Sequence, residues 1–273
     1  MIGLDLFTGY GGISLAIGQW VRPVAYCEID PYCRGVLLSR MADGRLPRAP
    51  IWDDVTTLEG CQFAGMVDIV YGGFPCQDIS VAGRGVGLAG ERSGLFFEIL
   101  RLAKEIKPAF VFLENVPAIR TRGLDRVVRE LSDLGYDCRW DHLSAYDVGA
   151  PHKRDRWFLL AYSSRFSKRK PANKTNAEST SWEAWHESGH GGAFGNPDIA
   201  GLEIGESREP REQPSPIGTN WWESEPDVGR VVNGCPARVD RIRSLGNGVV
   251  PAQAREAFRR LMGISDEVKR DVG

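Results

Sequence analysis

The strongest constraint on the fold is a series of short apolar runs that end in glycine or in polar residues. Two stretches between them, at residues 93–102 and 124–134, have the apolar spacing of a helix. Alternation of this kind is typical of an α/β fold built on one mostly parallel sheet, whose carboxyl edge gathers the residues that follow the strands. The apolar runs occupy residues 2–7, 24–27, 69–71, 109–113, 136–143 and 157–161.

The first apolar run leads into a glycine turn and then into a helical stretch. The turn reads TGYGG at residues 8–12, and ISLAI follows at 13–17. Such a turn lets a ligand approach the backbone at a helix N-terminus, as α/β folds do for nucleotide-like cofactors. The spacing G-x-G-G departs from the G-x-G-x-x-G of dinucleotide folds, which disfavours NAD.

Carboxylates follow the next two predicted strands. Glu28 lies 19 residues after Gly9, at the end of the run 24–27, where an acidic residue can accept hydrogen bonds from both hydroxyls of a ribose. Asp54 stands where a third strand would end, a suitable place to meet an adenine amino group. Either carboxylate alone is also explained as a cap or turn residue, but the two together favour an adenosine site.

A cysteine and a glutamate follow two further strands. Gly72 and Gly73 allow a sharp turn after the run 69–71, so that Cys76 sits on a loop at the end of a strand. A lone cysteine is more often a small buried packing residue, so this position alone does not establish a reactive thiol. Glu114 follows the run 109–113 and therefore places a carboxylate at the same sheet edge. The glycine-rich stretch at 81–87 indicates a mobile loop.

Composition excludes several classes of protein. The six cysteines form no C-x-x-C pair, so we expect neither a zinc site nor a disulfide framework. No signal peptide or membrane span is apparent, which favours a cytoplasmic protein. A net charge of −2 excludes a uniformly basic coat, but clustered basic residues could grip a phosphate backbone if they line one cleft. They are Lys153, Arg154, Arg156, Arg165, Lys168, Arg169, Lys170, Arg238, Arg241 and Arg243.

The composition changes abruptly after the last of these strands. We predict a catalytic and cofactor-binding domain at residues 1–162, a small irregular domain at 163–235, and a segment at 236–273 that returns to the first domain through an amphipathic helix. The middle part is rich in Ser, Gly, Pro, Asn and charge, without helical or strand periodicity. Its tryptophans argue against plain disorder.

In this order the motifs resemble those of the cytosine-5 DNA methyltransferases of bacterial or phage type. The resemblance implies a Rossmann-like fold for S-adenosylmethionine-dependent methyl transfer, with a mostly parallel sheet and a small target recognition domain at 163–235. The matching segments are DLFTGYGGIS from Asp5, Glu28, Asp54-Val55, GGFPCQDIS from Gly72, RSGLFFEI from Arg92, FLENV from Phe112, R-x-R at Arg154 and Arg156, and GNGVVP from Gly246.

The chemistry explains why such residues are needed. C5 of cytosine is a poor nucleophile until a thiolate adds to C6, and we expect Cys76 to supply that thiolate. Glu114, held protonated by partial burial, would hydrogen-bond N3. The resemblance implies that Arg156 holds the base through O2, and that Arg154 orients the cysteine loop or a phosphate. The target base must be flipped out of the duplex.

The resemblance also assigns residues to ligands. Gln77, Ser80 and Arg84 would touch DNA, the partner is duplex DNA, no metal is required, and we expect a monomer, as part of a restriction-modification system. His152, Thr8 and Tyr10 depart from the residues common at their positions in the family. The residues expected around the cofactor, S-adenosyl-L-methionine, are Phe7, Thr8, Gly9, Tyr10, Gly11, Gly12, Glu28, Ile29, Asp54, Val55, Pro75, Leu95, Asn247 and Val249.

Three alternatives remain at this stage. The same reaction on RNA is the nearest, since related folds methylate cytosine in transfer RNA, although a recognition segment of this length and charge favours DNA. A DNA-binding relative that has lost catalysis is disfavoured by the presence of Cys76, Glu114 and both arginines. A thiol-dependent oxidoreductase with a nicotinamide cofactor conflicts with the glycine spacing.

Overall fold

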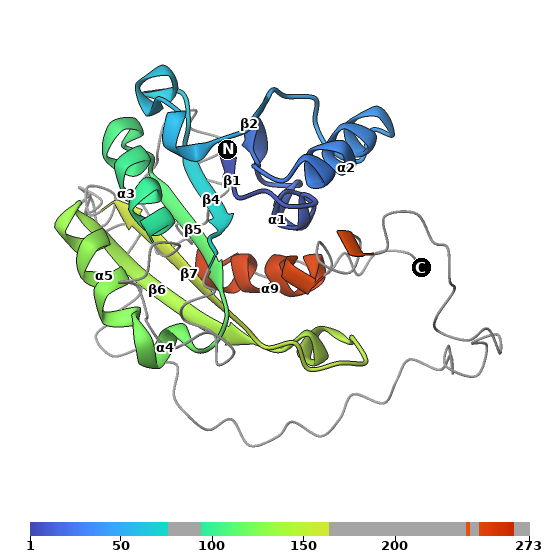
Figure 1. Cartoon of the computed structure of the whole chain (residues 1–273). Helices are drawn as coiled ribbons and strands as arrows, with labels where there is room; N and C mark the ends of the chain where they lie inside the picture. Colours follow the sequence, from blue (N-terminus) through green and yellow to red (C-terminus); the bar gives the residue numbers. More distant parts are fainter. Residues whose placement is uncertain (76–93, 164–238, 241–245, 265–273) are drawn as a thin grey trace, which may run out of the picture.

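The computed structural model describes residues 1–75, 94–163, 239–240 and 246–264 (Figure 1). Within them the helices are α1 (Gly12–Ile17), α2 (Pro31–Ala42), α3 (Leu95–Ile106), α4 (Ile119–Arg122), α5 (Leu124–Asp133) and α9 (Pro251–Met262). The strands are β1 (Ile2–Leu6), β2 (Arg22–Cys27), β3 (Ile51–Trp52), β4 (Ile69–Gly73), β5 (Phe110–Asn115), β6 (Tyr136–Leu143) and β7 (Arg156–Ser163). Short 3₁₀ helices are η1 (Val55–Thr57), η2 (Gly60–Phe63) and η5 (Ala145–Val148).

These strands form one sheet in the order β3-β2-β1-β4-β5-β7-β6. β1 pairs in parallel with β2 and β4, β2 with β3, and β4 with β5, whereas β7 runs antiparallel to both β5 and β6. The predicted mostly parallel sheet is therefore confirmed. One edge collects the carboxyl ends of β1, β2, β4 and β5 together with the amino end of β7.

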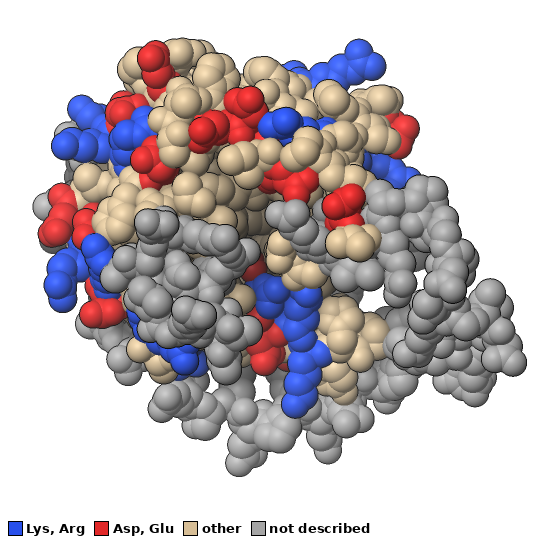
Figure 2. Space-filling model, viewed as in Figure 1, with Lys and Arg blue, Asp and Glu red and all other residues tan. Residues whose placement is uncertain are grey.

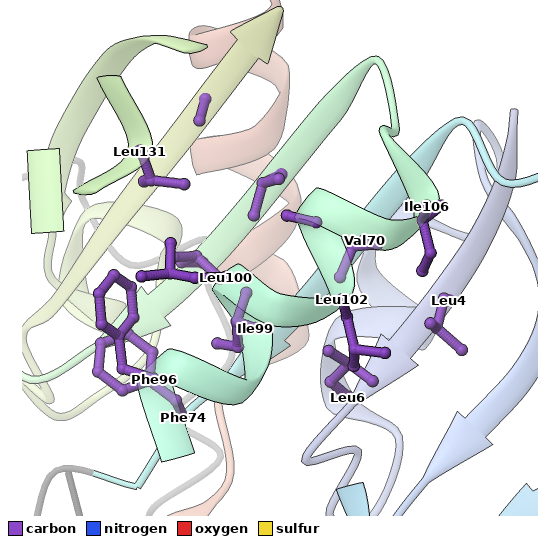
Figure 3. Close-up of a cluster of buried hydrophobic side chains, with 14 of the residues drawn as sticks. Leu4, Leu6, Val70, Phe74, Phe96, Ile99, Leu100, Leu102, Ile106 and Leu131 are labelled. Atoms are coloured by element: carbon purple, nitrogen blue, oxygen red, sulfur yellow. The ribbon is translucent and has the colours of Figure 1, made fainter. Parts of the chain in front are cut away.

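Side-chain alternation along the central strands divides the core into two layers. On β5, Val111 and Leu113 belong to a cluster with residues of α3 and α5, whereas Phe110 and Phe112 belong to a cluster with residues of α1 and α9. All six residues of β5 are buried, as expected for an apolar strand covered on both faces. Figure 3 shows part of the first layer, in which side chains of α3 lie beside Leu4 and Leu6 of β1 and Val70 of β4.

The amphipathic C-terminal helix predicted from the sequence is α9. Ala257 and Phe258 on this helix are fully buried, and Phe258 packs edge-on against Phe112 of β5 at a ring distance of 5.1 Å. Val249, just before the helix, is also buried. Residues 246–264 thus return to the sheet that residues 1–163 build (Figure 1).

Some sequence expectations are not tested by this structure. The domain division at 163–235 and the mobile loop at 81–87 fall on residues outside the described ranges, apart from Ser163 at the end of β7, and stay predictions. Helix α2 was not predicted; it begins at Pro31, and the carboxylate of Asp30 caps it by accepting the N–H groups of Tyr32 and Cys33. In the described part of the chain, no helix is long and apolar enough to cross a membrane.

Candidate active site

A cavity of about 450 Å³ opens at the carboxyl edge of the sheet. Its walls come from residues at or just after the carboxyl ends of β1, β2, β3, β4 and β5 and from the first turns of α1, α2 and α3. The first residue of β7 and residues 246–249 before α9 complete them. The size lies within the usual range of small-molecule sites, about 300–1,000 Å³. In the space-filling view, basic side chains gather near the middle of the molecule with acidic ones beside them (Figure 2).

The turn after β1 forms the first wall. Phe7, Gly9 and Gly11 all have positive φ, at 52°, 57° and 83°, which glycine adopts readily. The Thr8 hydroxyl lies within hydrogen-bond distance of the carbonyl oxygens of Asp5 and Cys27, at 3.1 and 3.3 Å. The predicted strand, glycine turn and helix are therefore confirmed, and the turn is tied to the end of β2.

Glu28 holds this turn from the neighbouring strand. Its Oε2 accepts the N–H of Gly9 at 2.6 Å, and its Oε1 accepts the N–H of Asp30 at 2.7 Å. Burial of the side chain raises the pKa of Glu28, against the lowering effect of these two N–H groups. A carboxylate has about four acceptor positions, so others remain for the hydroxyls of a ligand.

Asp54 is a cap residue, and its role in an adenosine site stays a prediction. Its Oδ1 accepts the N–H and the hydroxyl of Thr56 at 2.9 and 2.7 Å, so the residue caps η1. These hydrogen bonds lower the pKa of Asp54. The residue also lines the cavity, as do Ile29 and Val55.

Glu114 and Arg156 meet on the opposite side of the cavity. Glu114 is near the end of β5, Arg156 begins β7, and Arg156 Nε lies 2.7 Å from Glu114 Oε1. Burial raises the pKa of Glu114 to about 7, although Arg156 and Arg154 lower it. The partner of Glu114 across β4 is Gly73, where a Cβ would lie 2.5 Å from Glu114 Oε2. Glycine at this position therefore makes room for the carboxyl group.

Arg154 lies behind the cavity wall. Its backbone has φ of +36°, and its guanidinium donates to the carbonyl oxygens of Gly246, at 2.8 Å, and of Gly248. Those two glycines line the cavity on either side of Asn247, whereas Arg154 does not. Arg154 thus connects the start of β7 to the segment before α9.

The structure brings most of the predicted site residues together. Each residue assigned to the cofactor lines the cavity except Gly11, which faces away from it: a Cβ there would lie 2.7 Å from Leu46 Cδ1. Glu114 and Arg156 line it as well. Cys76, Gln77, Ser80 and Arg84 lie outside the described residues, although Pro75, which precedes Cys76, is in the wall. The binding and catalytic roles of all these residues stay predictions.

Several wall residues were not predicted. Most are chain neighbours of predicted ones, and Asn115 shows what such a neighbour does: its Nδ2 donates to the carbonyl of Phe74 at 3.3 Å, which ties the end of β5 to the loop before Cys76. Cys33 gave no signal because it depends on the unpredicted α2. The additional residues are Ile13, Cys27, Asp30, Cys33, Gly73, Phe74, Asn115, Val116, Gly246 and Gly248. Among the described residues, no group of three or more His, Cys, Asp and Glu side chains is suited to hold a metal ion.

Comparison with known proteins matches the chain to one family. The model of the C-5 cytosine-specific DNA methylases matches residues 1–193. The Type II methyltransferase M.CviJI of Paramecium bursaria Chlorella virus IL3A is 35% identical over 181 residues, covering 66% of this chain and 48% of the viral protein. M2.BsuMI of Bacillus subtilis is 34% identical over 167 residues, covering 58% and 41%. The chain thus spans about half the length of these relatives or less.

A solved structure supports the fold. The Entamoeba histolytica methyltransferase EhMeth superposes with a TM-score of 0.50 at 16% identity, covering 65% of this chain and 57% of that one. At this identity the likeness concerns the fold alone. Together with the sheet order and the family match, it confirms the predicted Rossmann-like methyltransferase fold.

Proposed function

The chain belongs to the C-5 cytosine-specific DNA methylase family, and on that premise we propose that it transfers a methyl group from S-adenosylmethionine to C5 of a cytosine in duplex DNA. The observation that best supports this is the pairing of Glu114 with Arg156 at 2.7 Å on the wall of the cavity. The same cavity is lined by Gly9 and by Glu28, which accepts the N–H of Gly9. One cavity therefore combines residues suited to bind a nucleoside with a carboxyl group, that of Glu114, whose pKa lies near neutral pH.

The residues on the acidic side of the cavity fit the adenosine part of the cofactor. Glu28 retains acceptor positions for the two ribose hydroxyls, and the turn at Gly9 leaves the backbone open, since a Cβ there would meet nothing within 4 Å. Ile29, whose side chain is 72% exposed, offers an apolar surface at the rim to a planar base. When bound, S-adenosylmethionine supplies an electrophilic methyl group.

Glu114 is the proposed acid. With a pKa of about 7, the carboxyl keeps a proton in a substantial fraction of molecules at neutral pH, so it can donate a hydrogen bond to N3 of the base. Negative charge develops toward N3 when a nucleophile adds to C6, and a proton held there lowers the barrier. Arg156 fixes the carboxyl group and would hold the base through O2.

Cys76 is the proposed nucleophile. Its thiolate forms a bond to C6 while N3 gains the proton of Glu114, which turns the C5–C6 double bond into an electron-rich enamine. C5 then takes the methyl group and loses its proton to solvent. N3 returns its proton to Glu114 as the bond between C6 and the sulfur breaks, which restores the ring and the Cys76 thiolate. Pro75 in the cavity wall is consistent with a thiol at the next position reaching the same space.

Cytosine stacked in a duplex cannot reach such a cavity. We propose that the target nucleotide flips out of the helix, at a cost of a few kcal/mol. Because the matched relatives are Type II methyltransferases, we further propose a modification enzyme of a restriction-modification system. That the enzyme is monomeric and cytoplasmic stays a prediction. Gln77, Ser80 and Arg84 would contact the DNA around the vacated position.

The test is a methyl-transfer assay with competing substrates. Purified protein and S-adenosylmethionine are offered duplex DNA and transfer RNA together, and methylcytosine is measured in each. The proposal predicts methylation of DNA; methylation of transfer RNA alone would favour the RNA alternative. Failure to bind S-adenosylmethionine in calorimetry would favour a DNA-binding protein without catalysis.

A further inference from the structure

A fully buried glutamine bonds the chain next to Arg156, the partner of Glu114. Gln253 is in the first turn of α9 and has no exposed surface. Its Nε2 donates to the carbonyl oxygen of Leu143 at 2.6 Å and to that of Arg154 at 2.8 Å. Both partners are acceptors, so only the amide NH₂ group can face them, and the orientation of the side chain is fixed.

The two carbonyl groups belong to the residues that frame Arg156. Leu143 ends β6 and is the direct partner of Arg156 across the β6–β7 ladder. Arg154 lies two residues before Arg156 in the turn that enters β7. Gln253 therefore bonds the last residue of β6 and the segment that enters β7, next to the position from which Arg156 meets Glu114.

The turn at Arg154 needs such support. Its φ of +36° lies in a region that residues other than glycine rarely adopt, so the backbone is strained there. The segment that contains Gln253 holds the residue from both ends: the Gln253 amide binds its carbonyl group, and the carbonyl oxygens of Gly246 and Gly248 bind its guanidinium. The turn is also held at Lys153, whose carbonyl oxygen accepts the N–H of Ala145 and the hydroxyl of Ser144, both at 2.6 Å, so the bonds at Arg154 add to this support.

We propose that Gln253 is a positioning residue that holds the Arg154 turn so that Arg156 meets Glu114. The amide oxygen of Gln253 has no hydrogen-bond partner among the described residues, so its burial carries a cost that packing alone does not explain. An apolar side chain would fill this place without that cost. The NH₂ group is what the position requires.

A direct titration of Glu114 tests the proposal without any assay of activity. Arg156 and Arg154 are the charged groups that act on this carboxyl, and the Tyr10 phenol is a neighbouring titratable group. Protein labelled with ¹³C at the glutamate carboxyl carbon is titrated by NMR, and the Glu114 signal is assigned with Glu114→Gln. Arg156 lowers the pKa of Glu114, so a displacement of Arg156 in Gln253→Met should raise the titration midpoint of Glu114 by about 0.5 pH unit or more.

Two further variants separate positioning from packing. Phe258→Leu weakens the packing of α9 on β5 without touching the turn, so it should lower the melting temperature and leave the Glu114 midpoint unchanged. Gln253→Asn keeps an amide but is one methylene too short to reach both carbonyl groups, and it should shift the midpoint in the same direction as Gln253→Met. A midpoint that stays at the wild-type value in both folded Gln253 variants would overturn the proposal.

Activity gives a second and separable result. Resting on the proposed function, we expect kcat for DNA methylation to fall about tenfold or more in Gln253→Met, since small displacements of catalytic groups are costly. An unshifted titration with normal methylation by the wild-type protein would refute the role of Gln253 alone. A shifted titration with no methylation by the wild-type protein would refute the proposed function and leave the role of Gln253 standing.

Discussion

Arg156 Nε lies 2.7 Å from Glu114 Oε1, and the two side chains are only 13% and 10% exposed. Two opposing effects meet in this contact: burial favours the neutral carboxyl group, and the guanidinium favours the charged one. Burial is the larger, so the pKa of Glu114 rises to about 7. The carboxyl can therefore bind Arg156 and still carry a proton at neutral pH, as the proposed mechanism requires.

The first prediction concerns Glu114→Gln. The amide fills the same space but has no acidic proton to give to N3, so the rate of methylation should fall about 10²-fold or more. Rapid-quench measurement of a single turnover gives this rate. Binding of S-adenosylmethionine should be retained; a normal rate would mean that another group serves N3.

The second prediction concerns the pH dependence of the same step. Since Glu114 must be protonated when the thiolate attacks, the single-turnover rate of the wild-type protein should decline as pH rises above about 7. The residual rate of Glu114→Gln should lack this decline, because the amide does not titrate. Identical profiles for the two proteins would contradict the assignment.

The third prediction concerns the cofactor. Glu28→Gln replaces one carboxylate oxygen by an NH₂ group, which cannot accept the N–H of Gly9 or Asp30 or a ribose hydroxyl. We expect the dissociation constant for S-adenosylmethionine, measured by calorimetry, to rise about tenfold or more. The matched control is Asp53→Asn, an exposed acidic residue beside Asp54, which should bind as the wild-type protein does. Equal affinities for Glu28→Gln and the wild type would remove Glu28 from the site.

The fourth prediction concerns Asp5, whose carboxyl group is fully buried beneath the glycine turn. Its Oδ2 accepts the Ser14 hydroxyl at 2.5 Å, and Ser14 Oγ lies 2.7 Å from Tyr71 Oη. Burial raises the pKa of Asp5 to about 8, so the folded protein holds a proton that the unfolded chain releases near pH 4. The free energy of unfolding should thus fall as pH rises from about 4 to 8, by up to ~1.4 kcal/mol per pH unit.

Urea unfolding at a series of pH values measures this slope. Glu114 adds a slope of the same sign between about pH 4.5 and 7, so the diagnostic region lies above pH 7. There the fall in stability should be absent in Asp5→Asn and persist in Asp133→Asn, a change at an exposed helix end. Persistence of the slope in Asp5→Asn would contradict a protonated Asp5.

The fifth prediction compares two adjacent glycines of β4. A Cβ at Gly73 would lie 2.5 Å from Glu114 Oε2, a side-chain atom that can move. We therefore expect Gly73→Ala to fold normally but to methylate DNA more slowly than the wild-type protein. A Cβ at Gly72 would strike the carbonyl oxygen of Leu6 in the adjacent strand, so Gly72→Ala should lose about 4 kcal/mol of stability or more. Chemical unfolding and single-turnover rates distinguish the two; full activity in Gly73→Ala would contradict the close approach.

Local sequence predicts the parts of this molecule that local physics determines. The apolar run before Glu114 is a strand buried on both faces, and the run before the TGYGG turn is β1. A short continuous apolar stretch bounded by glycine or polar residues is typical of a buried strand. Strand ends meet at one edge of a parallel sheet, and this is why Glu28 and Glu114 could be assigned to one cavity.

Other parts depend on partners that are remote in the chain. Gln253 binds carbonyl groups 110 and 99 residues away, and the Tyr10 hydroxyl donates to the carbonyl of Val249, so no neighbouring residue signals either contact. The direction of β7 is likewise hidden, since an apolar run reads the same in a parallel or an antiparallel pairing. Helix α2 was not predicted because it buries only Cys33, Leu37 and Met41 along its twelve residues, which leaves a weak apolar pattern in the sequence.

The most direct test of the central claim is mass spectrometry of nucleosides from unmethylated duplex DNA of mixed sequence, incubated with the purified protein and S-adenosylmethionine. Cys76→Ser serves as the matched control, because it removes the proposed nucleophile and should still bind the cofactor in calorimetry. We predict 5-methylcytosine with the wild-type protein and none with Cys76→Ser. The account would be contradicted if the wild-type protein formed no 5-methylcytosine in DNA, or if Cys76→Ser formed it at the wild-type rate.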